Sequence, residues 1–207
     1  MRIVIRPQWR GACIVILCLL SGCGSLLPSQ PYMARADWPL APMPPMQQVP
    51  APDGKVVVVR NLAAGPGLDR RGVATITSSG SVNYDYYNQW AVDPAAAASG
   101  ALTDWLAASG KFSAIVGPGS RLDPDLIVEG ELTEFVADST TGQSRATITL
   151  TVLDADNGVH TLIGQRRLQG LAPLADTAPA DVIRSERAAL ADALRQSVGF
   201  VVAASAR

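Results

Sequence analysis

The sequence predicts an α+β domain in which two helices pack on one face of a mixed, mainly antiparallel sheet. Three observations support this prediction. Residues 145–154 alternate between apolar side chains and threonines, which is typical of a strand with one buried face. Segments 94–109 and 179–204 place apolar residues at helical spacing. Residues 56–59 are all valine, and β-branched residues favour strands.

The first part of the domain is predicted to contain three strands and a helix. The valine run 56–59 is continuous, so we expect a strand buried on both faces. Residues 73–77 and 82–87 are expected to form two short strands joined by a Ser-Ser-Gly-Ser turn. Asp93 is a suitable cap for a helix, and Pro94 suits the first helical turn.

The second part is predicted to contain four strands and a closing helix, at residues 112–116, 126–136, 145–154, 159–169 and 179–204. A two-residue turn at Asn157-Gly158 would place Leu162 and Leu168 on the face opposite to the apolar residues of the preceding strand. We therefore expect a longer loop or a bulge near residues 154–158 that brings both leucines to the buried side.

The N-terminus has the pattern of a secretory signal. Basic residues precede an apolar run from Ala12 to Leu20, and small residues follow before Cys23. The segment Leu20-Ser21-Gly22-Cys23 resembles the lipobox of bacterial lipoproteins. That resemblance implies removal of residues 1–22 and a covalent lipid, palmitate included, on Cys23. Several acyl chains hold a protein firmly to a membrane, so the mature chain would be anchored without spanning it. The alternative is an ordinary cleaved signal that contains a cysteine.

A proline-rich tether is expected between the anchor and the domain. Residues 24–55 contain eight prolines, which block helix and sheet and favour an extended chain. The predicted divisions are therefore the signal peptide 1–22, the lipidated cysteine and tether 23–54, and the folded domain 55–207. Apolar residues of the tether, such as Trp38, would dock on the domain or on a partner.

Composition excludes several classes of function. Removal of the signal would leave 14 basic and 18 acidic residues without a basic cluster, so nucleic-acid binding is not expected. The only histidine, His160, follows the predicted hairpin turn, and neither a nucleophile elbow nor a phosphate loop is present. The sequence therefore predicts a protein that is not an enzyme, with no metal and no cofactor other than the lipid on Cys23.

The densest aromatic cluster is the candidate binding site. It consists of Tyr84, Tyr86, Tyr87 and Trp90. Packing in the core beside the following helix is one interpretation. A partner interface at Tyr86, Tyr87 and Trp90 is the other, since tyrosine and tryptophan are enriched at binding hot spots.

The order of these features resembles the ABC-type transport auxiliary lipoproteins. A lipobox, a proline-rich tether and a valine-rich strand are followed by Trp90-x-x-x-Pro94, a leucine-containing helix and the strand 112–116. The later stretch 125–130 and the closing alanine- and leucine-rich helix fit the same order. The resemblance covers residues 55 to 203, almost all of the predicted domain.

The family includes the lipoprotein component of Pqi-type systems, which belong to the mammalian-cell-entry (MCE) class of intermembrane transport. The resemblance implies a lipid-anchored subunit that docks or scaffolds a lipid transport complex, with MCE-domain, permease and ATPase partners and the possibility of a homo-oligomer. Gly24 after the lipidated cysteine favours the outer membrane, with the domain facing the periplasm. The alternatives are a lipoprotein that itself binds lipid and a structural lipoprotein of envelope assembly, both independent of an ABC system.

Overall fold

The computed structural model describes residues 32–45, 47–155 and 158–207, and one compact unit spans Arg35–Arg207. Its elements in chain order are β1 (Ala36–Trp38), β2 (Val56–Val59), β3 (Ala63–Ala64), β4 (Gly72–Ile76), β5 (Val82–Trp90), α2 (Pro94–Ala108), β6 (Ala114–Val116), β7 (Leu126–Asp138), β8 (Gln143–Asp154), β9 (Thr161–Pro173) and α3 (Pro179–Ser205). The predicted strands and helices are all present, whereas β1 and β3 were not predicted.

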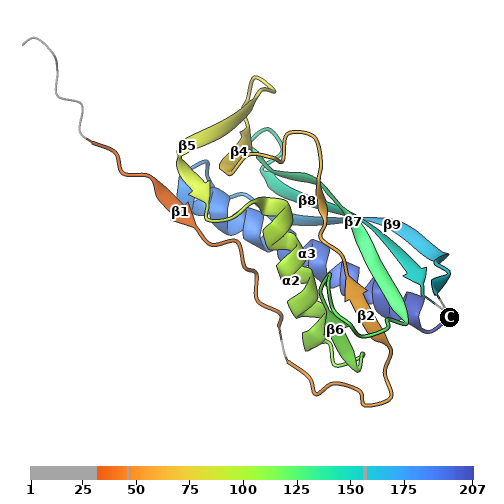
Figure 1. Ribbon diagram of the computed structural model, residues 1–207. Coiled ribbons are helices and arrows are strands. Elements are labelled where there is room, and N and C mark those ends of the chain that lie inside the picture. The colour runs from red at the N-terminus through yellow and green to blue at the C-terminus, as the bar shows by residue number, and fades with distance from the viewer. Residues whose placement is uncertain (1–31, 46, 156–157) are drawn as a thin grey trace, which may run out of the picture. The chain divides into compact units, whose positions relative to one another are not determined.

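Strand β7 is the centre of the sheet. One of its edges pairs along the strand with β8, which pairs in turn with β9, and both pairings are antiparallel. The other edge is shared by three short parallel neighbours, β2, β3 and β4. Strand β6 extends the sheet beyond β2, while β5 and then β1 extend it beyond β4. The sheet therefore has a β2–β6 wing at the start of β7 and a β1–β5–β4 wing at its end (Figure 1).

The predicted fold class is confirmed. The sheet is mixed, because the long pairings are antiparallel and the short ones are parallel. Helix α2 packs against β2, β3, β6 and β7, and α3 packs against β7, β8 and β9. Val57, Val128 and Val152 are fully buried on the face that both helices cover. No helix in the described ranges is long and apolar enough to cross a membrane.

Helix α3 lies unusually close to β9. A Cβ atom on Gly170 would lie 2.1 Å from the carbonyl oxygen of Ala189 and 2.3 Å from the nitrogen of Ala193. Only glycine permits this approach of helix backbone to strand backbone. The close contact brings the long helix along the edge of β9.

Strand β2 is less buried than expected. Val57 and Val59 face the helices and are buried, whereas Val56 and Val58 are half-buried on the opposite face. The expectation of burial on both faces is therefore wrong, because both helices lie on the same side of the sheet. We call the uncovered side the open face.

Part of the segment predicted as a tether lies on the domain. Strand β1 pairs in parallel with β5, and Leu40 after it belongs to the buried core. The indole N–H of Trp105 donates a hydrogen bond to the carbonyl oxygen of Pro42 at 2.7 Å. Trp38 packs against the core, so this tether residue docks on the domain. Proline carbonyls remain strong acceptors, which lets a proline-rich chain bind along a folded surface.

The connection between β8 and β9 is longer than two residues. Strand β8 ends at Asp154 and β9 begins at Thr161. Residues 156–157, which include Asn157 of the predicted turn, lie outside the described residues. Leu168 is buried on the helix-covered face, as expected.

The expectation for Leu162 is wrong. Val152 pairs with Gly164, but Leu153 pairs with Leu162, so a bulge lies between these positions. A bulge reverses the faces of the residues beyond it. Because it lies within β9 and not in the turn, Leu162 falls on the open face and is 61% exposed.

Candidate functional site

Strand β5 contains a wide bulge that brings two tyrosines to the surface. Residues 85–88 lie opposite the single residue Val73 of β4. The carboxylate of Asp85 accepts hydrogen bonds from the backbone N–H groups of Tyr87 and Asn88 at 2.7 and 3.0 Å. These bonds satisfy amides that the bulge removes from the ladder, so Asp85 stabilises the protruding backbone.

Tyr86 and Tyr87 form a paired aromatic surface with Arg35. They are 62% and 39% exposed, and their rings meet edge to face with centroids 5.2 Å apart. The guanidinium carbon of Arg35 lies 3.9 Å from the centroid of the Tyr86 ring. We call these three residues the tyrosine surface. Arg35 was not predicted as a site residue because it precedes β1, in the segment predicted as a tether.

Trp90 is separated from the two tyrosines by its burial. It is 1% exposed and packs against Phe135 with ring centroids 5.7 Å apart. Its backbone carbonyl accepts a hydrogen bond from Nε of Arg71 at 2.7 Å. The core interpretation therefore holds for Trp90. Tyr86 and Tyr87 are exposed and could contact a partner. The predicted lipidation site Cys23 lies outside the described residues.

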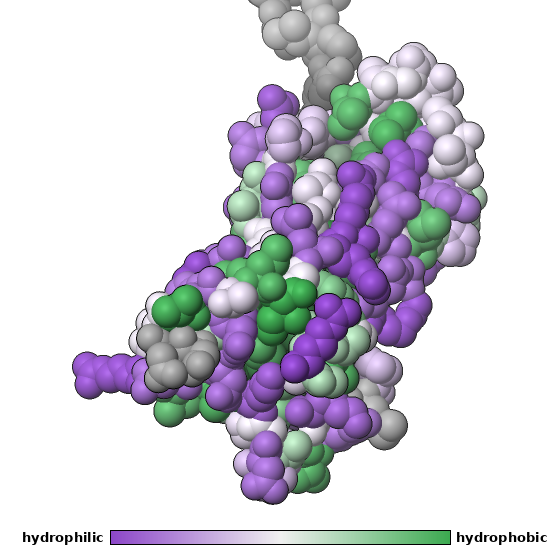
Figure 2. Space-filling model, turned by 90° about the vertical axis from the view of Figure 1, so that its right-hand side faces the viewer, coloured by the Kyte–Doolittle hydropathy of each residue, from purple (hydrophilic) through white to green (hydrophobic). Residues whose placement is uncertain are grey.

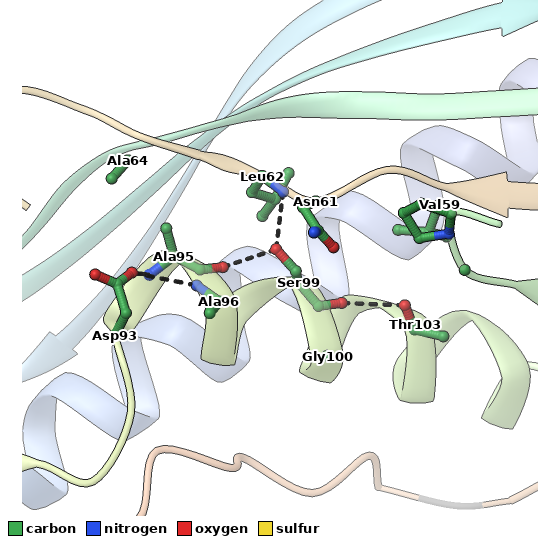
Figure 3. A pocket seen from close by; sticks show the side chains of 12 residues that line it. Val59, Asn61, Leu62, Ala64, Asp93, Ala95, Ala96, Ser99, Gly100 and Thr103 are labelled. Carbon is green, nitrogen blue, oxygen red and sulfur yellow. Dashed lines mark hydrogen bonds between the residues drawn. The ribbon is translucent and has the colours of Figure 1, made fainter. Parts of the chain in front are cut away.

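A pocket beside α2 contains hydroxyl and carboxylate groups that serve the fold (Figure 3). Its volume is about 500 Å³. Ser99 donates to the carbonyl oxygen of Ala95 at 2.7 Å and accepts from the backbone N–H of Leu62 at 2.8 Å. Asp93 accepts from the N–H groups of Ala95 and Ala96 at the start of the helix. These groups fasten α2 to the chain after β2, and they do not form a nucleophile–base pair.

His160 lines a different pocket of about 680 Å³, together with Lys55, Asp123, Asp125 and Asp154. The described residues contain no group of three or more histidine, cysteine, aspartate or glutamate side chains placed to hold a metal ion. This region therefore offers acidic surface and no assembled metal centre within the part of the chain that the structure describes.

The open face contains a network of ion pairs at the end of β7. Nε of Arg145 donates to Glu134 at 2.8 Å, and Nη1 donates to Asp138 at 2.7 Å. Burial alone would raise the pKa of Glu134, but hydrogen bonds from Arg145 and Thr147 hold it below its ordinary value. Hydrogen bonds from Thr140 and Arg145 hold the pKa of Asp138 well below its usual range.

Glu186 of α3 lies on the other side of the sheet and is completely buried. Neither carboxyl oxygen has a hydrogen-bond partner of good geometry among the described residues. Burial raises the pKa of this carboxyl well above its ordinary value, and the backbone N–H of Ala137 offsets only part of that effect. The sequence pattern already indicates that Glu186 is buried. It lies three residues after Ile183 and four before Leu190, on the apolar stripe of the helix.

Two solved structures of bacterial proteins share this fold. Protein XCC0632 from Xanthomonas campestris is similar at 15% identity with a TM-score of 0.67, over 83% of this chain and 97% of that one. The hypothetical protein CT253 from Chlamydia trachomatis is similar at 14% identity with a TM-score of 0.54, over 73% of this chain and 98% of that one. At this identity the likeness shows the fold alone. No curated protein matches the sequence.

A family model gives the stronger result. The model of the ABC-type transport auxiliary lipoprotein component matches residues 39–197. This range begins just after β1, on the segment that lies along the domain, and ends within α3. It includes β2 to β9, all of α2 and most of α3. The chain belongs to the family of ABC-type transport auxiliary lipoprotein components.

Proposed function

We propose that this protein is the lipid-anchored auxiliary subunit of an MCE-type ABC system that moves lipid between membranes. The observation that carries the proposal is the family match over residues 39–197. Lipid on Cys23 would hold the domain at the periplasmic face of the outer membrane. The MCE-domain, permease and ATPase subunits would supply the channel and the ATP hydrolysis, and this chain would dock them.

The tyrosine surface is the proposed docking site. It combines two exposed aromatic rings with a guanidinium group, a combination that is enriched in binding hot spots. The bulge is stabilised by Asp85 before any partner binds, so little conformational entropy is lost on docking. The alternative of a lipid-carrying domain gains no support from the space between helices and sheet, where Leu102, Leu150 and Leu190 are fully buried.

Replacing Tyr87 tests the docking site. We expect Tyr87→Ala to weaken binding of the MCE-domain partner by about 2 kcal/mol, since truncation of an exposed hot-spot aromatic removes contact without opening the core. Co-purification of the lipoprotein with its partner measures this. Leu122→Ala is the matched control, because Leu122 is also exposed and apolar but lies in the loop before β7. Equal recovery of the partner by wild type and Tyr87→Ala would place the docking site elsewhere.

Replacing Cys23 tests the anchor. We expect Cys23→Ala to leave a soluble or uncleaved precursor that no longer complements a deletion strain, because the acyl chains provide the membrane attachment. Fractionation of inner and outer membranes measures the location of both forms. A Cys23→Ala protein that still sediments with the outer membrane and restores function would contradict the lipid anchor.

A further inference from the structure

The outer edge of β9 is covered by helix α3 over half of its length. Among the described residues β9 pairs with β8 alone, so its second edge has no neighbouring strand. The backbone N–H of Leu171 donates to the Asp192 carboxylate at 3.2 Å, and the side-chain amide of Gln196 donates to the carbonyl oxygen of Gln169 at 2.8 Å. Polar side chains of α3 therefore replace a neighbouring strand at these two positions.

The uncovered half of the edge lies toward the start of β9. In a strand, the N–H and C=O of one residue point to the same edge, and alternate residues point to opposite edges. Because Leu171 and Gln169 point outward, Arg167 and Gln165 do so too. On this outward side, neither residue has a neighbouring strand in the part of the chain that the structure describes. These outward amides and carbonyls can pair with an added strand.

The sequence of α3 changes at the same point. Asp192, Gln196, Gly199 and Ala203 follow one another at helical spacing along the side of the helix that borders this edge. The first two have polar side chains that cap the strand. Gly199 and Ala203 have no polar side chain that could do this. A Cβ placed on Gly199 would meet no other atom within 4 Å. The helix therefore leaves space beside Arg167 and Gln165.

The side chains around the uncovered edge define the chemistry of an occupant. Arg166 and Arg167 are both exposed, and Leu162 is an exposed apolar residue on the same stretch of strand. Arg166 also lies over the ring of Phe200 in α3. Figure 2 views the molecule from the side of β9 and the C-terminus and shows hydrophobic surface grouped among hydrophilic residues. An occupant that complements this edge is acidic and apolar.

We propose that the uncovered half of β9, residues 162–167, binds an extended acidic segment of a partner protein as an added strand. The outward backbone groups of Gln165 and Arg167 would pair with the segment. Carboxylates on the two faces of the added strand would lie beside Arg166 on the helix-covered side and beside Arg167 on the open face. A second copy of β9 fits poorly, because antiparallel self-pairing brings the arginines of both copies together. This binding edge is separate from the tyrosine surface and does not depend on the docking proposed there.

The first experiment uses a defined probe. The mature lipoprotein, purified in detergent, is titrated against a fluorescein-labelled ten-residue peptide in which pairs of valines alternate with pairs of glutamates, so that carboxylates lie on both faces of the added strand. Fluorescence anisotropy measures the dissociation constant. We expect the corresponding valine–lysine peptide to bind on the order of tenfold more weakly, because lysine repels Arg166 and Arg167. Equal binding of the two peptides, or no binding of the acidic one, would overturn the proposal.

Two pairs of variants locate the binding to the edge. Gln165→Pro removes an outward N–H that takes no part in pairing with β8, while Gln165→Ala keeps it. Gly199→Gln places an amide beside the edge as Gln196 does, whereas Gly199→Ala adds a side chain without one. We expect the proline and glutamine variants to weaken peptide binding on the order of tenfold and both alanine variants to bind as wild type.

The same variants decide between a partner strand and a second copy. Melting temperatures confirm that each variant is folded, so weak binding is not mistaken for unfolding. Light scattering reports the oligomeric state of the wild type and of Gln165→Pro. If the proline variant binds the acidic peptide as tightly as Gln165→Ala does, the edge is not the binding site. If wild type is an oligomer that Gln165→Pro dissociates, the occupant is a second copy and the proposal fails.

Discussion

The two faces of the sheet place glutamates in opposite electrostatic environments. On the helix-covered face Glu186 is surrounded by the core and has no ionic partner among the described residues, so burial raises its pKa. On the open face Glu134 accepts hydrogen bonds from Arg145 and Thr147, and its pKa is lowered. The difference shows that burial alone does not determine the charge of a carboxyl group. Whether the carboxyl group also has a charged partner within hydrogen-bond distance decides the direction in which its pKa shifts.

The architecture explains why the partner is available on one face only. On the open face Arg145 comes from β8, directly beside β7, and its side chain extends along the surface to Glu134 and Asp138. On the covered face the strands present apolar side chains at the same positions, because the helices exclude water there. The carboxyl group of Glu186, which enters from α3, is therefore surrounded by apolar side chains of the described strands.

The largest expected effect comes from breaking the covered face. Trp90→Ala should lower the free energy of unfolding by about 3–5 kcal/mol, because the lost ring leaves a cavity against Phe135. Tyr87→Ala is the matched control, and it should change stability by less than about 0.5 kcal/mol since Tyr87 lies at the surface. Urea unfolding measures both. Similar midpoints for the two variants would mean that Trp90 contributes little to the core.

A smaller effect should follow from the buried carboxyl. The folded-state pKa of Glu186 is raised above its ordinary value of 4.5, so its contribution to stability is present below pH 4.5 and lost as pH rises toward the folded-state pKa. The slope should approach about 1.4 kcal/mol per pH unit. Glu186→Gln, which cannot ionise, should remove this loss. Parallel stability curves for wild type and Glu186→Gln between pH 4.5 and 7 would contradict it.

The smallest effect should come from the open face, and its sign should be opposite. The folded-state pKa of Glu134 lies below its ordinary value of 4.5, so its contribution is present above pH 4.5 and lost as pH falls through the folded-state pKa. Glu134→Gln should cost less than about 1 kcal/mol at neutral pH, since the pair is partly solvated. Its stability should also fall less than that of wild type between pH 4.5 and 3. A steeper fall in the variant would show that Arg145 does not hold this carboxylate ionised.

Local sequence determined the order and type of most elements. The alternation of residues 145–154 specifies a strand with one buried face, and the structure places that strand as β8 with Ile148 and Leu150 buried. Asp93 and Pro94 specify the start of α2, where the Asp93 carboxylate accepts hydrogen bonds from helix N–H groups. These features depend on neighbours in the chain, so periodicity and capping chemistry suffice to predict them.

Tertiary structure alone decided the features on which the candidate sites depend. Strand β1 is too short to be recognised from its residues, and it forms because β5 offers a free edge. The bulge that exposes Tyr86 and the bulge that exposes Leu162 each result from pairing with a particular neighbour. Register and burial on a sheet are set by residues distant in the chain. The sequence therefore indicated Tyr86 and Tyr87 as a candidate site, but it could not show that Trp90 is buried apart from them.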